Sequence, residues 1–167
     1  MVVPRTLDRY LDGLADLPSA DRRSDALVRV AERSGATRVA SAAANVLGHP
    51  AHPLLTDLPI GFWTSAWMLD LLGHETDRVA ARRLIGLGVV SAVPTIVLGL
   101  GDLPALTPRK RRVAVLHAAA NSSAVLCYLV SWWQRRDDRH ERAVRWGWAG
   151  ATVATIGGAL GGFLSMG

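Results

Sequence analysis

Four long apolar stretches, separated by short arginine-rich segments, dominate this chain of 167 residues. They cover 54–72, 84–101, 113–133 and 146–166, and each is close to the ~20 residues that an α-helix needs to cross a bilayer. The pattern predicts an all-α fold, an integral membrane four-helix bundle over residues 46–167. A soluble bundle of buried helices is the alternative, and it is less compatible with four consecutive stretches of this length.

The N-terminal segment, residues 1–45, has a different pattern. Apolar residues at helical spacing predict a short amphipathic helix that ends at Pro18, a second from Ser19 to Gly35, and a third over 36–47. This segment is either a docking surface for a partner domain or a helical hairpin lying on the lipid headgroups. We prefer the hairpin, because amphipathic helices beside membrane spans commonly lie in the interface.

Charge and composition agree with a membrane location. Half of the residues are hydrophobic, and the net charge of +5 comes from arginines and lysines that lie between the apolar stretches. These positions favour anionic lipid headgroups as partners, and they argue against nucleic acid. The single cysteine, Cys127, lies within the third stretch and excludes a disulfide framework, a c-type haem attachment and a cysteine-ligated iron–sulfur cluster. No internal repeat is evident.

Two histidines precede the first apolar stretch in "LGHPAHPLLTDLPIG", residues 47–61. A residue before proline is disfavoured in the α region, so Pro50 and Pro53 predict an extended, polyproline-like segment with His52 at the helix cap. In that conformation the rings of His49 and His52 stand ~9 Å apart, too far for both to ligate one ion. At most one of them is expected to be a ligand.

Four crossings bring further polar groups to the same side of the bundle. His117 lies one turn inside the third stretch, and Asn121 lies one turn deeper on the same face. We expect His52 and His117 to approach each other there. Asp57 and Asp102 are predicted to orient the histidine rings, because a carboxylate bonded to the far ring nitrogen fixes the tautomer. The polar group on this side is His49, His52, Asp57, Asp102, His117 and Asn121.

Two features have competing explanations. An ionisable residue inside a membrane span is a candidate functional residue, but a structural histidine bonded to Asp102 or to a backbone carbonyl is the commoner outcome at a position such as His117. In the fourth stretch small residues recur every fourth position, which indicates close helix packing. That stripe consists of Gly150, Ala154, Gly158 and Gly162. In the first stretch Asp57 and Asp70 must face protein, water or the interface.

Four motifs together resemble a bacterial family of predicted four-span membrane proteins catalogued as domain of unknown function 2231. The motifs are "GHPAHPLLTDLPIG", "GLGD" at 99–102, "HAAAN" at 117–121 and "GGALGG" at 157–162. The resemblance implies a multi-pass protein of the bacterial cell membrane. Some relatives are joined to Rieske iron–sulfur or c-type cytochrome domains, which implies a Rieske or cytochrome redox partner.

Three function classes follow from these features. The first is a b-type haem protein that transfers electrons within the membrane, with iron held by His52 and His117 and with His49 as an alternative ligand. Asp57, Asp102 and Asn121 would support those ligands. The second is a non-catalytic membrane anchor or structural module for a redox partner, and the third is a proton or metal-ion pathway. No catalytic residues are predicted, and an enzyme is not the preferred interpretation.

Overall fold

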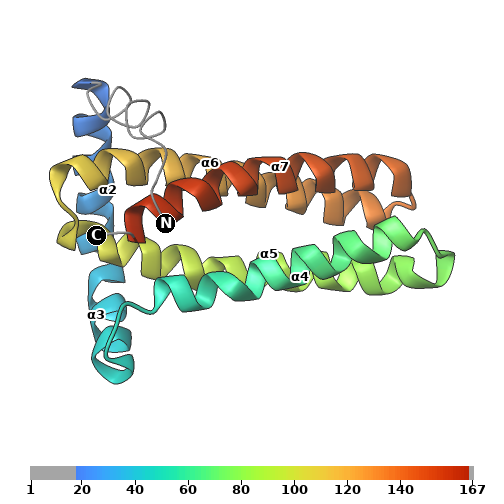
Figure 1. The fold of residues 1–167 in the computed structure, drawn as a ribbon, viewed down its shortest axis with the longest axis horizontal. Helices are drawn as coiled ribbons and strands as arrows, with labels where there is room; N and C mark the ends of the chain where they lie inside the picture. Colours follow the sequence, from blue (N-terminus) through green and yellow to red (C-terminus); the bar gives the residue numbers. More distant parts are fainter. Residues whose placement is uncertain (1–17, 166–167) are drawn as a thin grey trace.

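The computed structural model describes residues 18–165, and their regular secondary structure is entirely helical (Figure 1). The molecule is dominated by four long helices, α4 (His52–Leu72), α5 (Arg78–Asp102), α6 (Pro108–Arg136) and α7 (His140–Ser165). Each predicted apolar stretch falls on one of these helices, which confirms the all-α prediction.

The long helices form two antiparallel hairpins. The short 3-10 helix η1 (Glu75–Asp77) lies in the turn between α4 and α5, and η2 (Leu103–Ala105) joins α5 to α6. Within each hairpin the helices pack closely, and α5 also packs along α6. Helices α4 and α7 make little contact with each other, although the rings of Trp67 and Trp148 meet between them, and all four long helices lie side by side (Figure 1). The first and third long helices, α4 and α6, run parallel across the centre.

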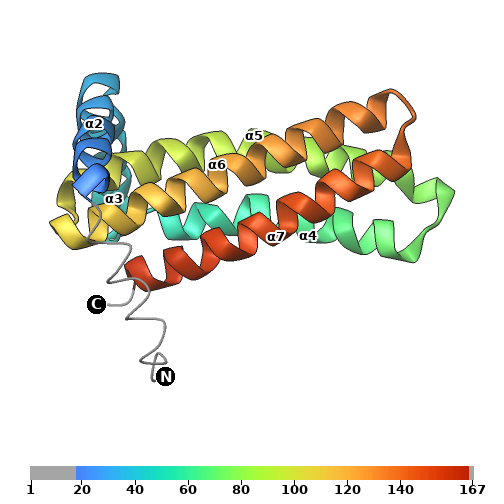
Figure 2. The same ribbon diagram turned by 90° about the horizontal axis from the view of Figure 1, so that it is seen from above.

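Two shorter helices, α2 (Pro18–Ser34) and α3 (Ala36–Leu47), lie across one end of the bundle, roughly at right angles to the long helices (Figure 2). Arg112 of α6 forms an ion pair of 2.6 Å with Asp21 of α2. Gly101 at the end of α5 packs against α3. These helices match the second and third predicted amphipathic helices, whereas the first lies outside the described residues.

The start of α4 differs from the prediction. His52 is the first residue of the helix and not an extended residue, and the preceding Ala51 is already helical with φ −83° and ψ −20°. Pro53 is compatible with this conformation because the first turn of a helix needs no hydrogen bonds from its N–H groups. The preference of a residue before proline for extended backbone is therefore overridden at His52.

Three segments of the described chain are long and apolar enough to cross a membrane, namely Glu75–Ala105, Pro108–Arg136 and His140–Ser165. Three of the four predicted spans are thus supported by the structure. Helix α4 is long enough, but its two carboxylates, Asp57 and Asp70, lower its mean hydropathy. Large apolar side chains cover the outer surface of the long helices, as at Val90, which is 69% exposed, and Leu126, which is 61% exposed. Such a surface suits contact with lipid.

Candidate functional site: a histidine pair in the helical bundle

His52 lies at the first turn of α4 and is held by α5. Its Nδ1 atom lies 2.8 Å from the carbonyl oxygen of Thr95. Because a carbonyl oxygen only accepts, Nδ1 carries the proton and donates it. Gly99 follows Thr95 by one helical turn, and a Cβ atom there would lie 2.7 Å from Cε1 of the His52 ring. The ring therefore rests on a helix surface that only glycine leaves free.

His117 of α6 is held by α7 in the same way. Its Nδ1 atom donates to the carbonyl oxygen of Gly157 over 2.8 Å. One turn later, a Cβ atom at Gly161 would lie 2.9 Å from Cε1 of the ring. Each histidine thus uses a carbonyl and a following glycine on the next helix of its own hairpin.

The two rings face each other across the centre of the bundle. Their centroids are 6.1 Å apart and their planes are nearly perpendicular, at 84°. Since Nδ1 holds the proton in each neutral ring, Nε2 carries a free lone pair. Two imidazole donors from parallel helices are therefore brought together, as the order of the crossings led us to expect.

Asn121 lies one turn after His117 and contacts both the ring and the backbone. Its Nδ2 atom donates to the carbonyl oxygen of His117 over 3.0 Å. The same atom lies 3.2 Å from Nδ1 and 3.1 Å from Nε2 of that ring. A donor aimed along the Nε2 lone pair would be roughly 5 Å from Nδ1. Asn121 therefore lies over the ring face and leaves the lone pair accessible.

Within the described residues, the other predicted site residues form no hydrogen bond with the rings of His52 and His117, although Asp102 lies near enough to His52 for their charges to interact. His49 is exposed, and its Nδ1 atom lies 3.0 Å from the carbonyl oxygen of Pro50. Asp57 is exposed on α4. Backbone carbonyls occupy the Nδ1 positions of both rings, so the predicted orienting role of Asp57 and Asp102 is taken by Thr95 and Gly157.

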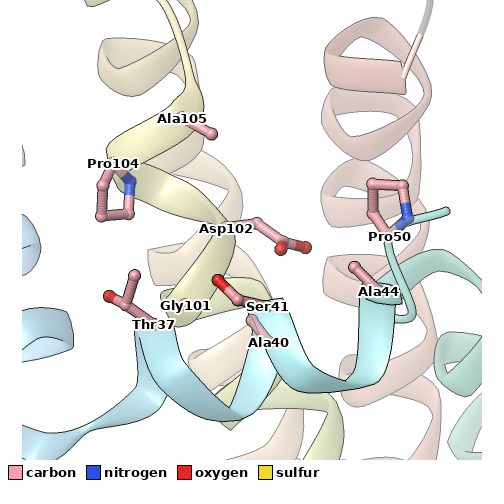
Figure 3. Close-up of a pocket in the computed structure, with 9 residues that line it drawn as sticks. All are labelled: Thr37, Ala40, Ser41, Ala44, Pro50, Gly101, Asp102, Pro104 and Ala105. Carbon is pink, nitrogen blue, oxygen red and sulfur yellow. The ribbon is translucent and has the colours of Figure 1, made fainter. Parts of the chain in front are cut away.

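Asp102 instead lines a groove of about 480 Å³ between α3 and the end of α5 (Figure 3). Its carboxylate points into this groove beside Ser41 and toward Pro50 (Figure 3). Within residues 18–165, no group of three or more histidine, cysteine or acidic side chains is arranged to hold a metal ion. The histidine pair is therefore a two-donor site.

Two further side-chain pairs lie deeper between α4 and α6. Trp63 stacks on Tyr128 with ring centroids 4.1 Å apart, and its Nε1 atom donates to the carbonyl oxygen of Ile85. Beyond this stack, Asp70 forms an ion pair with Arg135. From the sequence, Asp70 was expected to face protein, water or the interface, but its partner Arg135 was not identified. A buried carboxylate without a partner was the signal that could have identified it.

In the described residues, the apolar outer surface, three segments long enough to cross a bilayer and the polar pairs in the interior are features typical of an integral membrane protein. The chain belongs to the family described as predicted membrane protein (DUF2231), whose profile matches residues 48–166. The match covers the four long helices and excludes α2 and α3. No curated protein and no solved structure matches the chain.

Proposed function

We propose that this protein holds one b-type haem between His52 and His117 and transfers electrons within the membrane. The observation that carries the proposal is the separation of the two rings. Two imidazoles that bind one metal ion from opposite sides through Nε2, at ~2 Å per bond, have centroids roughly 6 Å apart. The observed separation is 6.1 Å.

The number of donors favours haem over a bare metal ion. A structural zinc ion takes four protein ligands, whereas haem iron receives four nitrogens from the macrocycle and needs at most two from the protein. The bond to a backbone carbonyl would by itself suit a structural histidine. Two such histidines, both protonated at Nδ1 and with ring centroids 6.1 Å apart, suit a pair of ligands for one iron better.

The residues around His52 and His117 can support the two rings as ligands. The carbonyls of Thr95 and Gly157 fix the tautomer of each ring and increase the basicity of Nε2. Alanines occupy positions 118–120 after His117, so the side chains that follow it along α6 are small. When bound, haem supplies a one-electron iron couple.

The proposal includes a fourth membrane span. In α4 the buried charge of Asp70 is neutralised by Arg135, and Asp57 lies near the end of the helix, where it can reach the interface. Helices α2 and α3 would then lie on the headgroups of a bacterial cell membrane. A Rieske or cytochrome domain is the proposed class of redox partner.

Absorption spectroscopy tests the proposed function. The protein is purified from cells that receive a haem precursor, together with His52→Ala, His117→Ala and, as a matched control, His49→Ala. We expect a Soret band in the wild type and in His49→Ala, and a much weaker band in the other two variants. A folded but colourless wild type would contradict the proposal and leave the membrane anchor as the preferred function.

A further inference from the structure

Side chains of α4 and α6 contact each other in a regular series. Asp70 and Arg135, which form the ion pair, are 65 positions apart. The same interval separates His52 from His117 and Trp63 from Tyr128. Every contact in this series therefore joins one position of α4 to the corresponding position of α6, at three levels along the bundle.

Helices α5 and α7 correspond in the same manner. A single interval separates Thr95 from Gly157, the two carbonyls that hold the histidines, and Gly99 from Gly161, the two glycines beneath the rings. It also separates Gly88, beneath Trp63, from Gly150, beneath Tyr128. Burial agrees, because Ala81 and its counterpart Ala143 are 1% and 0% exposed.

Any two parallel helices in a fixed register make contacts at one interval, so the series between α4 and α6 is not sufficient alone. The matching supports on α5 and α7 are not required by that register, and together with the series they indicate a two-fold axis, as in an isologous dimer. We infer that residues 52–102 and 117–164 are two copies of one helical hairpin, related by a two-fold axis that runs between α4 and α6. We further infer that Gly99 and Gly161 are equivalent positioning residues for the two rings. The presence of a ligand between the rings rests on the proposed function. Such a ligand would meet a histidine on each side, and each histidine would be held by a backbone carbonyl and a following glycine.

Gly99 and Gly161 matter for the position of the histidine rings and not only for the packing of the helices. A methyl group at Gly99 would approach Cε1 and Nδ1 of His52 to 2.7 and 2.8 Å, well inside ordinary contact. The ring would then have to move away from the carbonyl of Thr95. At Gly162, by contrast, no atom lies within 4 Å of the position a Cβ would take, and the same holds for Gly61. These two glycines are matched controls.

Nitrogen NMR of the detergent-solubilised protein without haem tests the positioning role. With ¹⁵N-labelled histidine at a pH where the rings are neutral, Gly99→Ala is expected to change the ring signals of His52 and leave those of His117. Gly161→Ala should do the reverse, and Gly61→Ala and Gly162→Ala should change neither ring. A glycine variant that leaves its own ring unchanged would overturn the inference. Because no haem is used, this outcome is independent of the proposed function.

Exchange of the stacked aromatic residues tests the duplication. If the two positions are equivalent, the double variant Trp63→Tyr/Tyr128→Trp keeps one indole and one phenol on the axis, each over a glycine. We expect it to melt at a temperature closer to that of the wild type than the poorer of the two single variants. A double variant that melts at or below the poorer single variant would show that the positions are not equivalent.

Discussion

Asp70 and Arg135 form a bidentate ion pair inside the helical bundle. The guanidinium donates to the two carboxylate oxygens over 2.9 and 2.5 Å, and the side chains are 7% and 1% exposed. Ser131 accepts from Nε of Arg135, and its hydroxyl donates to the carbonyl oxygen of Ala143 over 2.7 Å. The charges are thus compensated within the protein and linked to α7.

Loss of one partner is expected to destabilise the protein strongly. Asp70→Asn leaves the guanidinium of Arg135 buried without its counter-charge, and such changes cost about 3–5 kcal/mol. Thermal unfolding in detergent measures the effect. Glu75→Gln serves as the control, because the pair of Glu75 with Arg78 is exposed and contributes at most about 1 kcal/mol. Equal losses for the two variants would contradict the role of the buried pair.

The helices could be predicted from the sequence because hydrophobic length is a local property. The third amphipathic helix, 36–47, was predicted with the bounds that α3 has in the structure. The approach of His52 and His117 followed from the order of the crossings together with the similar depth of the two residues in their helices. The supports of the two rings did not, because backbone carbonyls leave no mark in a sequence.

The small-residue stripe predicted for α7 is only partly matched by the packing in the structure. A spacing of four residues drifts around a helix of 3.6 residues per turn, so a regular stripe does not stay on one face. Of the predicted stripe, Gly150 packs on Tyr128, whereas Gly158 and Gly162 have open space where a side chain would lie. Toward the C-terminus of α7, the glycines that approach α6 are Gly157 and Gly161, which contact Asn121 and His117.

The duplication was not evident in the sequence because few positions are identical between the halves. The residue types differ at Trp63 and Tyr128 and at Asp70 and Arg135, whereas the two histidines and several small residues are retained. The retained pairs include Ala81 with Ala143, Gly88 with Gly150, Ala92 with Ala154 and Gly99 with Gly161. Small residues are common in membrane helices, so their recurrence carries little information until the contacts are known.

Gly88→Ala is expected to destabilise the protein by about 1–3 kcal/mol, the range for overpacking a filled interior. A Cβ atom at Gly88 would collide with the indole of Trp63, which is 7% exposed and stacked on Tyr128. Thermal unfolding in detergent is again the measurement. Gly158→Ala is the control and should be close to neutral, and a loss equal to that of Gly88→Ala would contradict the packing account.

Cysteine labelling tests the four crossings. In a Cys127→Ala background, cysteines at Thr76 and Asp138 lie in the turns at one end of the bundle, and a cysteine at Thr107 lies at the other end. In sealed membranes, a reagent that cannot cross the bilayer should label the first two from one side and the third from the opposite side. Labelling of all three from the same side would rule out the four-span arrangement.

Electron paramagnetic resonance of the ferric, haem-loaded protein tests most directly whether His52 and His117 bind one iron together. Two imidazole ligands on one iron would give a low-spin ferric ion. The ring planes of His52 and His117 are at 84°, and such nearly perpendicular rings would leave the dxz and dyz orbitals of the iron nearly equal in energy. The low-spin signal should therefore be strongly anisotropic. Either His52→Ala or His117→Ala should convert this signal to a high-spin one or abolish it. A wild-type high-spin signal, or a low-spin signal that survives loss of either histidine, would contradict the shared site.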